Sequence, residues 1–132
     1  MTGMRWAQGV IATSAMLLTA VAQAEVPIGI GESATVRLSP QRDLAFPVRP
    51  PLAHAPANHG AILSFDVDAP GRYHVVTGAP GWIDVIRDGK AVAAAGERPV
   101  AGKALDYDLA AGHYMLQLSG MADGEVEVMI GE

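Results

Sequence analysis

Residues 65–78 are FDVDAPGRYHVVTG, and residues 105–120, LDYDLAAGHYMLQLSG, repeat the same pattern once gaps are allowed. In each copy, apolar and polar residues alternate up to an acidic D-x-D pair, a turn containing glycine follows, and a tyrosine opens the next alternating run. Alternation with a period of two predicts a strand with one buried face. Each copy is therefore predicted to form a hairpin, with Tyr73 or Tyr114 packed at the sheet corner. Duplication and convergence of two hairpins both explain the likeness.

Similar alternation extends in both directions from the two copies. It includes the sets Val36 and Leu38; Leu44, Phe46 and Val48; and Val126, Val128 and Ile130. Between Trp82–Arg87 and Lys90–Ala94 stands Asp88-Gly89, a pair that favours a two-residue hairpin turn. About eight or nine short strands at this spacing predict an all-β fold, an antiparallel β-sandwich or jelly roll.

Two segments interrupt the strand pattern. Residues 47–60 hold four prolines, which cannot join a central β-ladder because proline has no backbone N–H to donate. We expect this segment to be an ordered surface loop or an edge crossing. Residues 96–102 form the second irregular stretch.

Residues 1–24 have the features of an export signal in the required order. A short start carries Arg5, an apolar stretch runs over 10–22, and small residues precede the expected cut. The apolar stretch is shorter than the roughly 20 residues that a membrane-spanning helix needs. We therefore expect a signal-peptide helix that is cleaved near Ala24. The product is a single β-sandwich domain over 25–132, placed in the periplasm or secreted.

Composition narrows the function classes. Removing Arg5 from the chain's 9 basic residues leaves 8 against 14 acidic ones, a net charge of −6 that repels a phosphate backbone. The chain has no cysteine, which excludes disulfides, thiolate nucleophiles, thiolate metal sites and a cysteine-linked lipid anchor. We expect no nucleic-acid partner and no transmembrane segment in the mature chain.

Histidine is the remaining side chain for metal binding or for proton transfer near neutral pH. His54 and His59 stand five residues apart in the proline-rich segment, where they either share an ion or are two solvated loop residues. His74 and His113 lie on the face opposite their neighbouring tyrosines. They approach each other if the two hairpins are adjacent, and otherwise are exposed polar residues on the outer face of a sheet. These four are the candidate metal ligands, and we expect no cofactor.

The other candidates are carboxylates and one indole. Each D-x-D pair, Asp66 with Asp68 and Asp106 with Asp108, places two carboxylates on one strand face, which fits calcium binding, glycoside hydrolysis or a plain solvent face. Trp82 is either a stacking platform for sugars or a cap on the core. The serines after residue 24 lie in no nucleophile motif, so no catalytic residue is predicted.

The G-x-Y turn followed by alternating apolar residues, with a D-G hairpin, resembles the bacterial pre-peptidase C-terminal domain over Ala61–Ile130. This resemblance implies a β-sandwich that accompanies secreted enzymes as a non-catalytic appendage. In addition, GWIDVIRDGKAV (81–92) and LAAGHYMLQLSG (109–120) are similar to small stand-alone exported proteins of Gram-negative bacteria, some of which carry the name homogentisate dioxygenase. That name implies Fe(II) held by two histidines and a carboxylate.

The resulting prediction is an exported, non-enzymatic β-sandwich that binds a small ligand or a partner protein in the cell envelope. The alternatives are a histidine-based metal-binding protein or metal-dependent enzyme of the dioxygenase kind, and a subunit of an envelope assembly.

Overall fold

The computed structural model describes residues 26–50 and 58–132. The predicted signal peptide at 1–24 and the candidate ligand His54 lie outside the described residues. No helical segment within the described part has both the length and the apolar character that a bilayer crossing requires.

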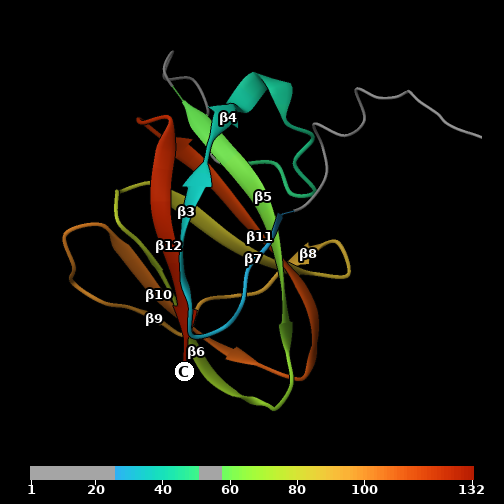
Figure 1. Ribbon diagram of the computed structural model, residues 1–132. Helices are drawn as coiled ribbons and strands as arrows, with labels where there is room; N and C mark the ends of the chain where they lie inside the picture. Colours follow the sequence, from blue (N-terminus) through green and yellow to red (C-terminus); the bar gives the residue numbers. More distant parts are fainter. Residues whose placement is uncertain (1–25, 51–57) are drawn as a thin grey trace, which may run out of the picture.

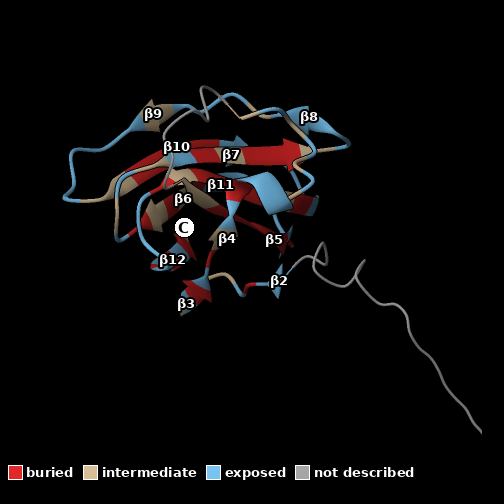
Figure 2. Cartoon of the chain, turned by 90° about the horizontal axis from the view of Figure 1, so that it is seen from above, coloured by how far each residue is buried: buried red, intermediate tan, exposed pale blue. Residues whose placement is uncertain are grey.

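The described residues form a sandwich of two β-sheets (Figure 1). The five-stranded sheet has the order β3 (Ser33–Arg37), β12 (Glu125–Gly131), β6 (Gly71–Thr77), β10 (Lys103–Leu109), β9 (Gly96–Glu97). The six-stranded sheet has the order β2 (Val26–Pro27), β5 (His59–Val67), β11 (Gly112–Met121), β7 (Trp82–Arg87), β8 (Lys90–Ala91), and β4 (Ser39–Pro40) also pairs with β5. Figure 2 shows the sheets side by side, with β9 and β8 at one edge and β3 and β2 at the other.

This architecture confirms the predicted β-sandwich. Every strand pair among the described residues is antiparallel except β2 with β5, which is parallel. Strands β2, β4, β8 and β9 have two residues each. Pairings as short as those of β2, β4 and β9 leave almost no alternation in the sequence, which is why these three strands were not predicted.

The core lies between the sheets and is mainly aliphatic. Its fully buried side chains come from both sheets and include Leu63, Val75, Val85, Leu116 and Val128. Phe65 and Tyr114 add a stacked aromatic pair with ring centroids 5.5 Å apart.

The hairpin prediction for the two sequence copies is wrong. Strand β5 belongs to the six-stranded sheet and β6 to the five-stranded sheet, so the turn between them carries the chain across the sandwich. Strands β10 and β11 make the same crossing in the opposite direction. The copies pair with each other, β6 with β10 and β5 with β11. Local alternation predicts a strand and its buried face but leaves open which sheet receives the next strand.

Two equivalent tyrosine contacts hold the crossings. The Tyr73 hydroxyl donates a hydrogen bond to the carbonyl of Ala69 at 2.6 Å, and the Tyr114 hydroxyl donates one to the carbonyl of Ala110 at 2.7 Å. Each hydroxyl therefore reaches a carbonyl four residues upstream, the arrangement known as a tyrosine corner in sandwich domains. The predicted position of both tyrosines at a sheet corner is confirmed.

The turn at Asp88-Gly89 is confirmed as a two-residue hairpin. Ile86 and Arg87 pair with Ala91 and Lys90. The φ angles of Asp88 and Gly89 are 53° and 78°, and a type I′ turn requires positive φ at both central positions.

The strand predicted over Leu44, Phe46 and Val48 is absent. A short 3-10 helix, η2 (Gln41–Asp43), leads into irregular chain up to Pro50. The Val48 backbone N–H donates to Gln117 Oε1 at 3.2 Å, and Gln117 Nε2 donates to the Val48 carbonyl at 2.7 Å. A buried side-chain amide thus replaces the neighbouring strand, because prolines on either side prevent a continuous ladder.

Candidate functional site

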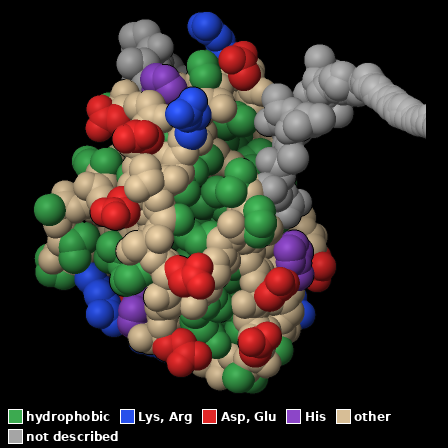
Figure 3. Space-filling model, in the orientation of Figure 1, with side chains coloured by type: hydrophobic (Ala, Val, Ile, Leu, Met, Phe, Trp, Pro, Cys, Tyr) green, Lys and Arg blue, Asp and Glu red, His purple; other side chains and the backbone are tan. Residues whose placement is uncertain are grey.

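The described histidines do not converge. His59 begins β5, whereas His74 points outward from the five-stranded sheet, opposite the inward Tyr73 and Val75. His113 points outward from the six-stranded sheet, opposite the inward Tyr114. Histidine side chains lie at separate places on the surface in Figure 3. Within residues 26–50 and 58–132, no three histidine, aspartate or glutamate side chains are grouped to hold a metal ion.

His113 and Arg72 occupy equivalent positions in the two crossings, one residue before the corner tyrosine. His113 Nδ1 lies 2.7 Å from Asp66 Oδ1 on the paired strand β5. Arg72 donates from Nε and Nη2 to the two carboxylate oxygens of Asp108 on β10, at 2.8 and 3.0 Å. The arginine bonds hold the pKa of Asp108 below its usual value. One aspartate of each predicted acidic pair therefore holds two strands together across a sheet.

Asp106 is at the centre of a third cluster of charged side chains. Asp106 lies on the outer face of the sheet but is only 9% exposed, because the side chains of His74 and Arg98 cover it. Arg98 Nε lies 3.1 and 3.2 Å from the two carboxylate oxygens, and His74 Nδ1 lies 3.0 Å from Oδ1. Burial alone raises the pKa of Asp106, but the bonds from Arg98 and His74 outweigh burial and lower it. This geometry ties β6, β10 and the chain after β9 together.

A polar groove opens at the sandwich edge where β7 faces β10. It measures about 280 Å³, and its lining includes Trp82, Asp84, Val92, Glu97, Lys103 and Tyr107. Strand β8 pairs only with the end of β7, so within the described part of the chain the first half of β7 has no strand neighbour on this side. The chain from β8 to β9 then crosses between the sheets, with Val92 bonded to Val85 and Ala95 to Asp106 through backbone atoms.

Trp82 stands in this groove with 47% of its surface exposed. Lys103 Nζ lies 5.6 Å from the centre of the indole ring, a cation–π distance, and 3.4 Å from Glu97 Oε2. Of the two sequence interpretations of Trp82, the exposed platform fits this geometry, and the core cap does not.

Asp84 is the unusual polar group of the groove. It is half-buried, and its Oδ2 atom is closed to solvent without a hydrogen-bond partner among the described residues. Burial raises the pKa of this carboxyl above its usual value. Burial, together with the charge of Asp84, also raises the pKa of Tyr107. An unpaired carboxylate in this position costs stability in the free protein.

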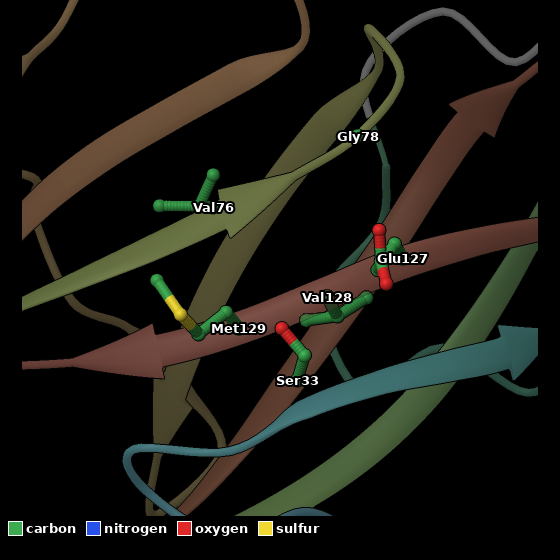
Figure 4. A pocket seen from close by; sticks show the side chains of 6 residues that line it. All are labelled: Ser33, Val76, Gly78, Glu127, Val128 and Met129. Carbon is green, nitrogen blue, oxygen red and sulfur yellow. The ribbon is translucent and has the colours of Figure 1, made fainter.

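A second hollow lies on the outer face of the five-stranded sheet. It measures about 160 Å³ and lies over β3, β12 and β6 (Figure 4). Its lining is mainly apolar, with Val76 and Met129 beside Gly78, and Glu127 contributes a charge. The lining residues do not supply the convergent polar groups that fix a small ligand, so the groove at Trp82 is the stronger candidate.

Replacement of Asp84 by asparagine is expected to stabilise the protein at pH 7. Because the folded-state pKa of Asp84 is raised, the contribution of this one carboxyl group to stability is greatest below the usual carboxyl pKa of about 4 and falls as the pH rises through the raised value. Asp84→Asn removes this loss, so its advantage in free energy of unfolding shrinks as the pH is lowered toward 4. Urea unfolding at both pH values measures the difference. Asp88→Asn, a change of the same chemistry in the exposed turn, serves as the control, and a less stable Asp84→Asn at pH 7 contradicts the expectation.

Sequence reasoning named Trp82 but missed Asp84 and Lys103. Asp84 has the ordinary appearance of a polar residue in a predicted strand, and no motif in the sequence links Lys103 to Trp82 or to Asp84. The three side chains line one groove because the two sheets pack with β7 facing β10. Only the folded chain brings them together, so no sequence signal could have found this set.

The comparisons with known proteins agree with this fold. The sequence matches no protein-family model and no curated protein. Among solved structures, the chain is similar to the pre-peptidase C-terminal domain of a collagenase from Bacillus anthracis, with a TM-score of 0.55 and 13% sequence identity. The match covers 82% of this chain and 95% of that domain. At this identity the likeness concerns the fold alone, and it confirms the resemblance to a pre-peptidase C-terminal β-sandwich.

Proposed function

We propose that the protein is an exported, non-enzymatic accessory protein of the cell envelope that binds its ligand or partner in the groove between β7 and β10. The observation that carries the binding role is the exposed indole of Trp82 beside the carboxyl group of Asp84, which lines the same groove and whose Oδ2 atom has no hydrogen-bond partner among the described residues. The unpaired carboxylate oxygen lowers the stability of the free protein. Features that break local rules in this way are typical of functional sites.

Two observations support a non-catalytic role. The sandwich resembles a class of domain that accompanies catalytic domains. In addition, five of the side chains that the sequence offered as candidates for chemistry are paired with charged neighbours: Asp108 with Arg72, Asp66 with His113, and Asp106 with His74 and also with Arg98.

Expression of the full chain with a C-terminal tag in a Gram-negative host tests export. We expect the tagged protein in the osmotic-shock fraction, with an intact mass that begins at Glu25, because residues 1–24 have the order of a cleavable signal. Leu17→Arg combined with Leu18→Arg interrupts the apolar stretch and should retain the full-length chain in the cytoplasm. A wild-type chain that keeps residues 1–24 and stays in the cytoplasm refutes the export half of the proposal.

Thermal unfolding with defined probes tests binding. The probes are disaccharides, short peptides, and the divalent cations Ca²⁺ and Zn²⁺. A ligand at a hundredfold excess over its Kd stabilises the folded state by about 2.7 kcal/mol, and we expect one organic class to do so in the wild type but not in Trp82→Ala. If no probe shifts the wild type, or if the shift is unchanged in Trp82→Ala, the groove is not the binding site.

A further inference from the structure

The groove combines three kinds of group that rarely meet at a plain surface. An indole, a carboxylate and an ammonium group, from Trp82, Asp84 and Lys103, line the same hollow, and the Tyr107 ring lies deeper. The volume of about 280 Å³ falls just below the usual range for drug-sized ligands, about 300–1,000 Å³. The occupant is therefore small, of the size of a mono- or disaccharide.

The indole is held in place from two sides. Lys103 Nζ lies over the ring and is itself bound to Glu97. On another side the chain at Gly120 approaches so closely that a Cβ atom there would lie 2.7 Å from Trp82 Cδ1. A ring fixed in this way loses little conformational entropy on binding. Its exposed surface suits the C–H face of a sugar ring, whose weakly positive hydrogens are attracted to the negative face of an aromatic system.

The carboxylate supplies the polar half of the recognition. Ionised aspartate only accepts hydrogen bonds, so the part of the Asp84 carboxylate that lines the groove suits a ligand that donates them. Sugar hydroxyls are such donors, and hydrogen bonds to a charged acceptor are stronger than those between neutral groups.

The charges of the groove select among saccharides. The lining contains two acidic residues, Asp84 and Glu97, and one basic residue, Lys103, so its net charge is negative. An anionic sugar is therefore repelled, whereas a neutral one is accepted.

We propose that the groove at Trp82 and Asp84 binds a neutral saccharide, with the sugar ring stacked on the indole and its hydroxyls donating to the carboxylate. This inference rests on the proposed binding function and names its ligand class.

Fluorescence titration of the full chain tests the ligand class. Trp6 is the chain's other tryptophan, so in a Trp6→Phe background Trp82 is the only indole. The probes are cellobiose and di-N-acetylchitobiose as neutral disaccharides, digalacturonate as an anionic one, and trialanine as a peptide. We expect a saturable blue shift of the emission with at least one neutral disaccharide, and roughly tenfold or greater weakening for digalacturonate, because like charge disfavours its binding.

Calorimetric titration of variants tests the site. We expect Trp82→Ala and Asp84→Asn each to weaken binding of the neutral disaccharide by roughly tenfold or more, in line with the loss of a stacking or charged hydrogen-bond contact. Asp88→Asn, with the same loss of charge outside the groove, is expected to bind like the wild type. If Trp82→Ala and Asp84→Asn bind the disaccharide as tightly as Asp88→Asn does, the assignment of the binding site to this groove is wrong.

The outcomes separate this inference from the proposed function. If trialanine binds through Trp82 and the saccharides do not, the saccharide class is wrong and the binding function stands. If no probe perturbs Trp82, both fail.

Discussion

Gly60→Ala is expected to lower the free energy of unfolding by about 3 kcal/mol, at the upper end of the usual cost of overpacking. Gly60 is buried in β5, beside the irregular pairing of β5 with β11. A Cβ atom added there would collide with the backbone carbonyl of Leu118, and it would also press on the Phe46 ring. Backbone cannot yield as a side-chain tip does, because moving it displaces the buried Leu118 side chain.

Gly124→Ala is the matched control for this change. A Cβ atom at Gly124 meets nothing within 4 Å, and its φ is not in the left-handed region. Urea unfolding of both variants compares them directly, and we expect Gly124→Ala to be as stable as the wild type or slightly more stable, because alanine restricts the unfolded chain. Equal stability of Gly60→Ala and Gly124→Ala contradicts the close approach of β5 and β11.

Leu116→Ala is expected to cost about 2–5 kcal/mol, the range for deleting a fully buried leucine side chain. Leu116 is 0% exposed and lies in β11 between Leu63 of β5 and Val85 of β7. A domain of this size has a total stability of about 5–15 kcal/mol. The loss is therefore a large fraction of the total stability.

Leu44→Ala provides the comparison of equal chemistry. Leu44 is only partly buried and lies outside the core cluster, in the irregular chain after η2. We expect it to lose less than half as much stability as Leu116→Ala in the same denaturation series. A larger loss of stability for Leu44→Ala than for Leu116→Ala would show that packing of the irregular chain after η2 contributes more to stability than the core between the sheets.

Strand positions followed from the sequence where the local pattern determines them. Leu63, Phe65 and Val67 alternate because one face of β5 is buried, and Asp88-Gly89 takes positive φ angles that few other residue pairs tolerate. The strand predicted over Leu44, Phe46 and Val48 does not form, because alternation in the sequence does not show whether a neighbouring strand can offer backbone hydrogen-bond partners. There the partner is the Gln117 side chain, 69 residues away from Val48.

The candidate site was less predictable than the fold. Histidines are conspicuous in a sequence, yet His74 and His113 lie in different sheets and pair with carboxylates on neighbouring strands. The groove depends instead on the meeting of β7 with β10, whose contact follows from the sheet topology and not from any spacing along the chain.

The exchange of partners between the two crossings also determines when the molecule can fold. Since β5 pairs with β11 and β6 with β10, neither sheet can close before residues 105–120 are available. Pairing of distant strands pays a loop-closure entropy first, and sandwiches of this kind fold in about milliseconds to seconds rather than microseconds. A polypeptide proposed to leave the cytoplasm benefits from this delay. The chain stays unfolded, and can therefore be threaded through a membrane, until residues 105–120 pair with β5 and β6.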